Sequence, residues 1–263
     1  MNASKLILKA ADSLVSAAVI LFLAVAGLYS AYALWDNAQV YAAVDNVQSE
    51  LLALKPTAEA VEEDGGASFE ELLAINPDVC AWLTLDGTQI DYPVLQGEDN
   101  LTYVNTDVYG DFALAGSIFL DSRCDRTFHE KYALLYGHHM DNSKMFGDLD
   151  LYEDQAFFEE NISGMLILPD RAYELETFAV LKVPASEDAI FSPQQWQTDT
   201  DGLLEFVQKE AVYIREDVMG RIGTTEDLSQ ILAMSTCSSE YTDARTILLA
   251  VMKPYAPQEE SGE

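Results

Sequence analysis

Three residues with reactive or charged side chains stand at the ends of apolar, strand-like runs of this sequence. Cys237 ends the run QILAMSTC, His138 ends KYALLYGH, and Arg245 begins a run that continues as TILLAVMKPY. A thiol becomes a nucleophile when its surroundings favour the thiolate or supply a base. The chain has three histidines that could act as this base, His129, His138 and His139. These residue types predict nucleophilic thiol chemistry.

Alternation along the strands predicts which side chains meet. Successive side chains of a strand point to opposite faces, so Tyr136 and His138 share one face if residues 133–138 form a strand. Ser235 and Cys237 share one face of the second run in the same way. Two such strands lying side by side would present a thiol and an imidazole on the same side of a sheet.

The spacing of Arg245 adds a cation to this pair. Arg245 follows Cys237 by eight residues, so a tight loop would let residues 245–252 run antiparallel to residues 230–237. The guanidinium would then lie near the thiol, where it could stabilise an oxyanion or hold a substrate carbonyl. The three residues together predict an acyl-transfer site.

Other readings of these residues are open on the sequence alone. A cysteine at the end of an apolar strand is often a buried core residue. The pair His138 and His139 could be half of a metal site, but no further Cys or His falls at zinc spacing. A phosphatase-type loop needs five residues between Cys and Arg and a helix after it, whereas here seven residues intervene and a strand-like run follows. A papain-like signature around the cysteine is absent.

Eight short apolar or alternating runs, separated by Asp, Asn, Gly and Pro, predict the elements that position the site. The runs are AWLTLD, QIDYPVLQ, GSIFLDS, YALLYGH, MLILPD, YELETFAVLKV, QILAMSTC and TILLAVMKPY. Eight candidate strands with few strong helices favour a β-barrel or sandwich in one domain. Two helical stretches, at about residues 149–162 and 200–214, interrupt the strands.

The N-terminal part carries a candidate membrane span. Residues 14–34 hold no charge, and at about 1.5 Å per residue they reach about 31 Å, the thickness of a bilayer's hydrocarbon core. Lys5 and Lys9 precede the span, which predicts a cytoplasmic N-terminus and an exported remainder. The alternative is a cleaved signal peptide, because Ala31-Tyr32-Ala33 fits a cleavage site.

The segment between the span and the strands predicts a stalk followed by a linker. Residues 36–54 have apolar residues at helical spacing, Pro56 ends the pattern, and TAEAVEEDGGA has the composition of a flexible acidic linker. A new helix is expected at Ser68, which has capping-box spacing to Glu71. We expect residues 1–12 in the cytoplasm, a transmembrane anchor at 13–35, a stalk helix and acidic linker at 36–66, a catalytic domain at 67–257 and a tail at 258–263.

Charge and cysteine content exclude other classes of protein. Residues 36–263 carry 12 basic and 44 acidic side chains, a net charge of 12 − 44 = −32, without a basic run. Binding to nucleic acid needs clusters of Lys and Arg and is not expected. Three cysteines are too few for a disulfide-stapled fold. A bridge between Cys80 and Cys124 stays open.

Several stretches of the chain resemble the sortases. The cysteine of MSTC, the later Arg245 and the histidine of YGHH match the cysteine, arginine and histidine signature of that family. NPDVCAWLTLDGTQIDYPVLQGEDN, GSIFLDSR and YGHHMDNSKMFGDL resemble class B sortases in particular, and the resemblance covers about residues 68–255. Ala233-Met234 departs from the usual Thr-Leu. Glu240 and Asp243 are the acidic residues nearest to Cys237, and neither has an assigned orienting role.

The resemblance implies both a fold and an activity. The fold is an eight-stranded sortase-type β-barrel with N-terminal helices and a helix in the loop before the strand of Cys237. The activity is transpeptidation outside a Gram-positive-type cell: Cys237 attacks the threonine carbonyl of a C-terminal sorting motif on an exported protein and forms a thioacyl enzyme. His138 would transfer protons and Arg245 would hold the carbonyl. Tyr136 and Ser235 would line the groove that binds the sorting motif, or they would only pack against neighbouring side chains.

The partners implied are exported proteins with a sorting motif, and an amine acceptor on the cell wall or on a pilin lysine. The enzyme would be a single-pass membrane protein with its catalytic domain outside the cell. No metal or organic cofactor is needed for this chemistry. Two alternatives remain: a thiol hydrolase with the same site, and a non-catalytic acidic ectodomain.

Overall fold

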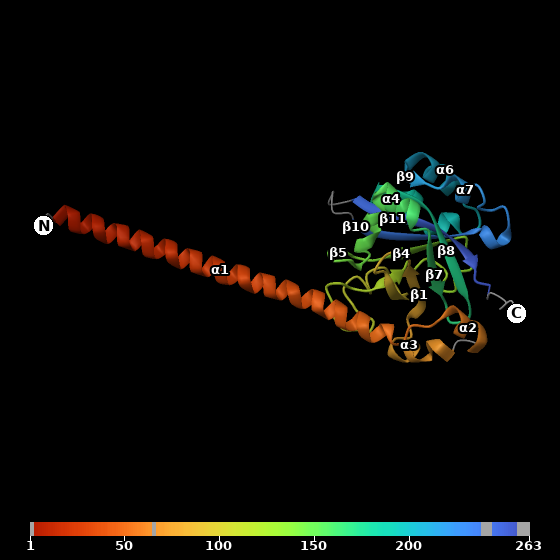
Figure 1. Cartoon of the computed structure of the whole chain (residues 1–263), viewed down its shortest axis with the longest axis horizontal. Helices are drawn as coiled ribbons and strands as arrows, with labels where there is room; N and C mark the ends of the chain where they lie inside the picture. Colours follow the sequence, from red (N-terminus) through yellow and green to blue (C-terminus); the bar gives the residue numbers. More distant parts are fainter. Residues whose placement is uncertain (1–2, 65–66, 238–243, 257–263) are drawn as a thin grey trace. The chain divides into compact units, whose positions relative to one another are not determined.

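The computed structural model describes residues 3–64, 67–237 and 244–256 (Figure 1). The chain divides into two compact units, Met1–Asn46 and Val47–Glu263. The first unit lies within helix α1 (Ala3–Leu52), a single helix of 50 residues. This helix is long and apolar enough to cross a membrane, with a mean hydropathy of 2.3 in its most apolar window. An N-terminal span is therefore compatible with the structure by length and composition.

The acidic stretch after α1 differs from the flexible linker that its composition indicates. Residues Ala58–Asp64 form helix α2, and Ala58 and Val61 are buried. The two apolar side chains lie three residues apart and so share one helix face, which packs into the core of the second unit. The acidic composition of the stretch hides this short amphipathic pattern.

The next helix begins later than its capping box predicts. A 3-10 turn, η1 (Ala67–Phe69), precedes helix α3 (Glu70–Ile75). Phe69 takes the N-cap position, and its side chain makes no cap hydrogen bond. Phe69 and Leu72 are fully buried, so the burial of these two side chains contributes to the position where α3 starts.

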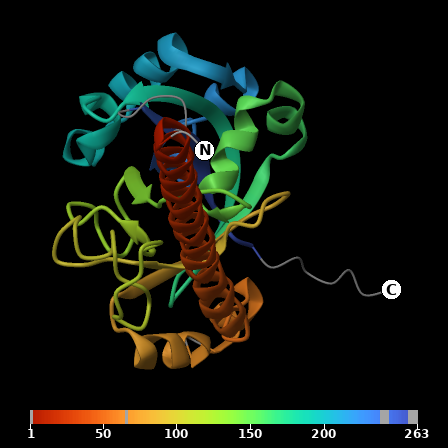
Figure 2. The same ribbon diagram turned by 90° about the vertical axis from the view of Figure 1, so that its left-hand side faces the viewer.

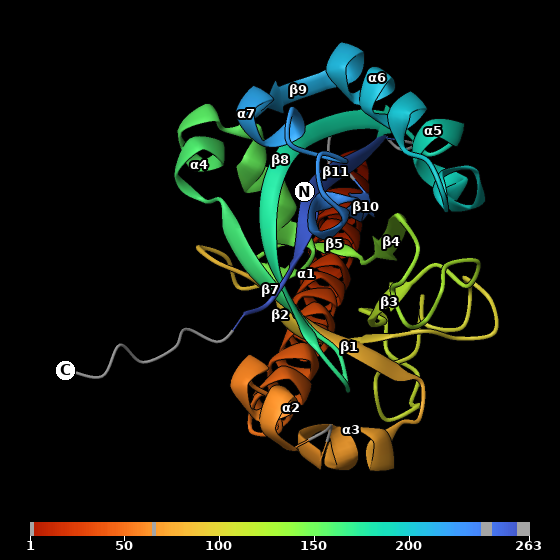
Figure 3. The ribbon, with the colours of Figure 1, turned by 90° about the vertical axis from the view of Figure 1, so that its right-hand side faces the viewer.

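The second unit is a closed eight-stranded β-barrel, one of the two architectures that the strand pattern favours and the one that the resemblance implies. The strands are β1 (Val79–Leu85), β2 (Asp91–Leu95), β3 (Ile118–Leu120), β4 (Tyr132–Tyr136), β7 (Ser163–Ile167), β8 (Ala172–Pro184), β10 (Gln230–Cys237) and β11 (Ala244–Pro254). The sheet order is β11, β10, β4, β3, β2, β1, β7, β8, and pairing of β11 with β8 closes the cylinder (Figure 3). The pairs β2–β3 and β4–β10 are parallel and the others are antiparallel.

A ninth strand lies outside the barrel circuit. β9 (Ala211–Ile214) pairs with the second half of the long strand β8. The sequence predicts a helix through residue 214, but helix α6 (Asp201–Glu210) ends four residues earlier. The residues Val212, Tyr213 and Ile214 prefer extended backbone, and the free edge of β8 offers them hydrogen-bond partners. β9, α6 and α7 (Glu216–Met219) lie together beside β8 (Figures 1 and 3).

Short helices and one hairpin fill the remaining connections. The hairpin consists of β5 (His139–Met140) and β6 (Lys144–Met145) and follows directly after β4. The predicted helix near residues 149–162 is a 3-10 helix, η2 (Gly147–Glu153), followed by α4 (Gln155–Glu160). The other short helices are α5 (Asp188–Phe191), η3 (Pro193–Trp196) and η4 (Glu226–Leu228). The long β2–β3 and β3–β4 connections extend beside β3 (yellow to yellow-green in Figures 2 and 3).

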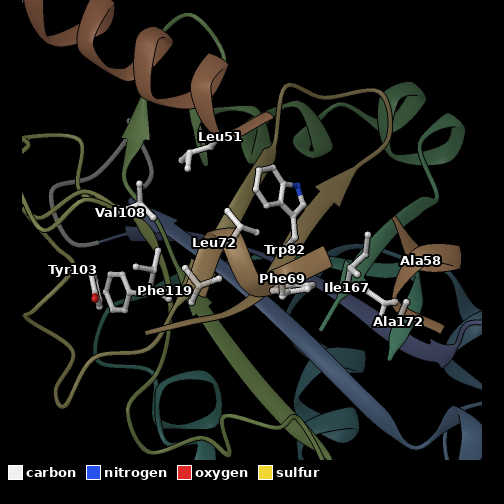
Figure 4. Close-up of a cluster of buried hydrophobic side chains, with 13 residues drawn as sticks. Leu51, Ala58, Phe69, Leu72, Trp82, Tyr103, Val108, Phe119, Ile167 and Ala172 are labelled. Carbon is white, nitrogen blue, oxygen red and sulfur yellow. The ribbon is translucent and has the colours of Figure 1, made fainter. Parts of the chain in front are cut away.

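One apolar cluster holds the outer helices and the β2–β3 connection against the barrel (Figure 4). Phe69 and Leu72 pack with Trp82 of β1, and Tyr103 and Val108 of the β2–β3 connection join the same cluster. The amide of Asn76 donates to the hydroxyl of Tyr103 and to the carbonyl of Val108, at 3.1 and 2.9 Å. The connection that follows β2 is therefore a fixed part of the core.

Cys80 and Cys124 are both free and buried. The bridge between them that the sequence leaves open does not form. The Cys80 thiol donates to the carbonyl of Val94 at 3.4 Å. Burial raises the pKa of each of the two thiols to about 12, so both are structural residues with little thiolate at neutral pH.

Candidate active site

A cavity of about 340 Å³ opens where β4 and β10 end. The predicted site residues His138, Arg245, Tyr136 and Ser235 all line it. The connections after β2, β3 and β8 contribute the rest of the wall. The full lining is Asn100, Val104, Phe119, Arg123, Tyr136, Gly137, His138, Ala185, Phe191, Ser235, Thr236 and Arg245.

Backbone pairing places Cys237 beside this cavity. Cys237 is the last residue of β10 and pairs directly with Arg245 of β11 in the antiparallel ladder. Two residues earlier, Ser235 pairs with Tyr136 of the parallel neighbour β4. The side chain of Cys237 lies outside the described part of the structure, as do Glu240 and Asp243. The antiparallel run of residues 245–252 along 230–237 that the sequence predicts is present.

His138 lies just beyond the end of its strand. β4 ends at Tyr136, two residues before the end that the alternation argument assumed, and the amide of Gly137 still donates to the carbonyl of Ser235 at 3.1 Å. His138 is half-buried, and its Nε2 is 2.8 Å from the carbonyl oxygen of Val104. A carbonyl only accepts, so Nε2 carries the proton and Nδ1 of the neutral ring is left as the acceptor.

The Val104 carbonyl is itself held in place by a turn at Gly116. Gly116 has a φ of +56°, and a Cβ built at this position would lie 2.3 Å from the oxygen of Val104. The next residue, Ser117, donates its amide to the carbonyl of Tyr103 at 3.0 Å. Only glycine allows this approach, because it lacks the atom that would clash and tolerates positive φ. The orientation of His138 thus depends on a turn 22 residues away in the sequence.

A buried carboxylate organises a further part of the cavity wall. Asp121 is fully buried and accepts hydrogen bonds from Arg123 Nε and Nη2, Asn100 Nδ2 and the Tyr136 hydroxyl, at 2.8, 2.6, 2.9 and 3.0 Å. Burial alone would raise the pKa of Asp121, but the bonds from Arg123 and Tyr136 outweigh it and lower the pKa. Asp121 is therefore ionised and fixes three residues that line the cavity.

The sequence argument missed this cluster of Asn100, Asp121, Arg123 and Tyr136, which we call the Asp121 hub. The signal was present, because GSIFLDSR contains Asp121 and Arg123 and matches a family motif, but it gave neither residue a role. Asp121 directly follows an apolar strand, a position in which many aspartates lie at the surface. Its burial is evident only in the folded barrel.

Tyr136 and Ser235 contribute to the cavity in different ways. The Tyr136 ring is stacked on Phe191 at 6.3 Å and contacts Phe119 at 5.3 Å, and its hydroxyl donates to Asp121. Tyr136 therefore offers an aromatic face rather than a polar group. Ser235 is 2% exposed, and its hydroxyl has no hydrogen-bond partner among the described residues. Its hydroxyl could bond to a molecule that fills the cavity.

The second histidine of the pair is engaged elsewhere. His139 Nε2 lies 2.9 Å from Asp150, and Asp150 also lies 3.1 Å from the hydroxyl of Thr246, the residue after Arg245. Within the described ranges no group of three His, Cys, Asp or Glu could hold a metal ion. His139 thus ties the β5 hairpin to η2 and β11.

Comparison with known proteins adds an independent line of evidence, although the chain matches no protein-family model. The chain is 31% identical over 185 residues to Sortase B of Staphylococcus aureus (strain NCTC 8325 / PS 47), covering 70% of this chain and 73% of that protein. It is 32% identical over 183 residues to Sortase B of Listeria monocytogenes serovar 1/2a (strain ATCC BAA-679 / EGD-e), covering 68% and 72%.

Solved structures agree with the sequence relatives. Spy0129 of Streptococcus pyogenes, a class B sortase involved in pilus biogenesis, is 37% identical, with a TM-score of 0.63 over 72% of this chain and 99% of that one. The crystal structure of Staphylococcus aureus Sortase B is 27% identical, with a TM-score of 0.66 over 82% and 99%. The barrel and its closure are therefore shared with these structures.

Proposed function

This chain belongs to the sortase B family of cysteine transpeptidases, and we propose that it cuts a C-terminal sorting motif on exported proteins and joins the released carbonyl to an amine. One observation carries the proposal. His138, Arg245 and Ser235 line one cavity at the end of the strand that bears Cys237. Ser235 and Arg245 lie on the neighbouring strands β10 and β11, whereas His138 follows β4, which comes much earlier in the chain.

Cys237 is the nucleophile in this proposal and Arg245 is its electrostatic partner. Directly opposite residues in an antiparallel pair share a face of the sheet, with Cβ atoms about 4.5–5.5 Å apart, and Cys237 is opposite Arg245. This register supports a thiol and a guanidinium that act on the same substrate carbonyl. Arg245 then donates to the oxyanion that forms when sulfur attacks.

His138 moves the protons of both half-reactions. The Cys237 thiolate attacks the threonine carbonyl, the C–N bond breaks, and the departing amine takes a proton from the His138 imidazolium, which leaves a thioester. An incoming amine loses a proton to the neutral imidazole as it attacks the thioester, and the thiolate and imidazolium are restored. Nδ1 serves this transfer, since Nε2 is held by the Val104 carbonyl.

The N-terminal helix supports a location for the reaction at the outer surface of the membrane. We assign residues 13–35 as a single membrane anchor with residues 1–12 inside the cell and the catalytic domain, 67–257, outside, because the span is uncharged and basic residues precede it. Residues 36–66 then connect the two and residues 258–263 form a tail. Tethering the enzyme beside a membrane-borne substrate raises the effective concentration of both.

Two acceptors fit the chemistry of the second half-reaction. Both a cell-wall cross-bridge and a pilin lysine offer a primary amine. One solved relative is described as taking part in pilus biogenesis, so a pilin lysine stands beside the cell wall as a candidate acceptor for this chain.

The test uses the full chain in detergent with a library of LPxTG-like and NPxTx-like peptides. We expect mass spectrometry to find a thioester adduct on Cys237 and, after an amine is added, a transfer product. Cys237→Ala, His138→Ala and Arg245→Ala should each abolish transfer while circular dichroism shows an intact fold.

Two other outcomes distinguish the alternatives. A hydrolase with the same site would release the peptide acid even with excess amine. A non-catalytic ectodomain would form no adduct with any peptide and would keep its cellular activity after Cys237→Ala. This outcome would contradict the proposal that the chain is an enzyme.

A further inference from the structure

Arg123 presents a pair of unused donors to the cavity. Its Nε and Nη2 bond to Asp121, and Nη2 also donates to the carbonyl of Phe191 at 2.7 Å. Among the residues that the structure describes, none accepts from Nη1. The side chain is 37% exposed and lines the same cavity as His138 and Arg245. The guanidinium plane is thus fixed by Asp121 and by the Phe191 carbonyl, while Nη1 makes no hydrogen bond to the residues that the structure describes.

The hub around Arg123 leaves it little freedom to turn. Asp121 is fully buried and binds the guanidinium in the bidentate geometry that fixes its plane. The Phe191 carbonyl holds the other side. Asn100 is partly occupied, since one N–H of its Nδ2 donates to Asp121 and its Oδ1 accepts from the amide of Ser122. Arg123 Nη1 is therefore the charged donor of this cluster that is available to a ligand.

Charge determines which kind of ligand group this wall prefers. The lowered pKa keeps Asp121 ionised, so Arg123 and Asp121 together carry no net charge. A carboxylate at Nη1 would be attracted by Arg123 but repelled by the carboxylate of Asp121. It would also lose its hydration in the cavity. A neutral oxygen gains the hydrogen bond without that repulsion. Phe119 and Phe191 also line the cavity. Their apolar rings favour an uncharged peptide group, because a charged group would lose its hydration beside them.

We propose that Arg123 is a specificity-determining residue whose Nη1 donates to a neutral carbonyl oxygen of the sorting peptide, and that Asp121 is the positioning residue that aims it. This deepens the proposed function and rests on it. The oxygen belongs to a carboxamide side chain or to a peptide carbonyl. In either case this oxygen is a different one from the carbonyl under attack, which Arg245 serves in the proposed function.

The experiment measures selectivity within each variant. The full chain in detergent is assayed for amine transfer with the library peptide that gives the strongest Cys237 adduct. One peptide series replaces each carboxamide side chain by an apolar isostere, and a second series replaces each backbone amide by a thioamide, whose sulfur accepts hydrogen bonds weakly. The ratio of kcat/KM between parent and analogue is then compared across variants.

We expect one analogue to lose about 10-fold or more with the wild type, the range for a hydrogen bond to a charged group. With Arg123→Met the same ratio should fall to near one. Arg123→Lys should lose most of this selectivity, because its donors all lie on one nitrogen and cannot reproduce the planar fork that contacts Asp121 with one edge and the peptide with the other. Lys209→Gln removes one positive charge on the exposed face of α6 and serves as the matched control, with the ratio unchanged.

A loss of folding cannot imitate this result, because misfolded enzyme lowers kcat/KM for parent and analogue alike. Equal ratios in the wild type and Arg123→Met would overturn the proposal, and so would a wild type indifferent to every analogue. If no peptide forms an adduct on wild-type Cys237, the proposed function itself fails. A clear adduct with unchanged selectivity refutes only the role of Arg123.

Discussion

Arg245 illustrates how far the chemistry depends on one side chain. Its guanidinium has a planar set of donors, whereas the lysine ammonium is a point charge. We expect Arg245→Lys to lower kcat for amine transfer by about 10²-fold, the loss seen when an oxyanion donor is removed. Steady-state assays with a saturating peptide would measure this. Transfer by Arg245→Lys at the wild-type rate would show that charge alone suffices at this position.

The buried thiols provide a second prediction at this scale. With the pKa of Cys80 and Cys124 raised to about 12 by burial, only about one thiol in 10⁴ is ionised at pH 8. Iodoacetamide at pH 8 should therefore label native protein only at Cys237, and Cys237→Ala should take no label until it is unfolded. Peptide mapping by mass spectrometry checks this. Labelling of native Cys237→Ala would show that the interior opens readily.

The sequence indicates which residues are reactive, but it does not show which residues hold them in position. Cys237 and Arg245 could be proposed because rare residue types stand at strand ends at a short spacing, whereas the choice of His138 among three histidines followed from the family resemblance. Asp121 could not be recognised, because its importance comes from burial on all sides by groups distant in the chain. The Val104 carbonyl could not be found either, since every residue has one.

The β2–β3 connection shows how an element outside the barrel governs the site. Gly116→Ala would place a Cβ 2.3 Å from the Val104 oxygen and so displace the group that orients His138. Misplacement of a catalytic group by about 1 Å can cost about 10²-fold, and we expect kcat to fall at least about 10-fold. Gly110→Ala is the matched control, because Gly110 also has positive φ but has open space where a Cβ would lie.

The comparison of these two variants separates strain from contact. Both variants place alanine at a positive φ, which strains the backbone. The melting temperatures of both variants report this shared strain. Only Gly116→Ala should lose transfer activity. Equal activity in the two variants would mean that the Val104 carbonyl does not orient the imidazole.

The elements that the sequence misjudged share one cause. The segment now in α2 has three apolar residues, Ala58, Ala60 and Val61, and β9 has a four-residue strand pattern after a helix. Each is too short to show its own periodicity. Each forms because a surface already exists, the core for α2 and the edge of β8 for β9. The eight barrel strands were predictable because their apolar runs are longer and regularly separated.

The N-terminal helix makes a prediction for the whole molecule. If residues 13–35 anchor the protein, the full chain should remain with membranes after an alkaline carbonate wash, and protease added outside cells should digest the catalytic domain. The uncharged span is the physical reason. N-terminal sequencing supplies the control. A mature chain that begins just after Ala33 would show a cleaved signal peptide and remove the anchor.

The closing pair of strands has a consequence for the life of the newly made protein. β11 completes the cylinder by joining β10 to β8, and it also supplies Arg245. On the proposed topology, a newly made chain whose residues 244–254 have not yet folded would have neither a closed barrel nor Arg245 at its place beside β10. We therefore expect the new chain to be inactive towards sorting peptides until β11 has paired with β10 and β8.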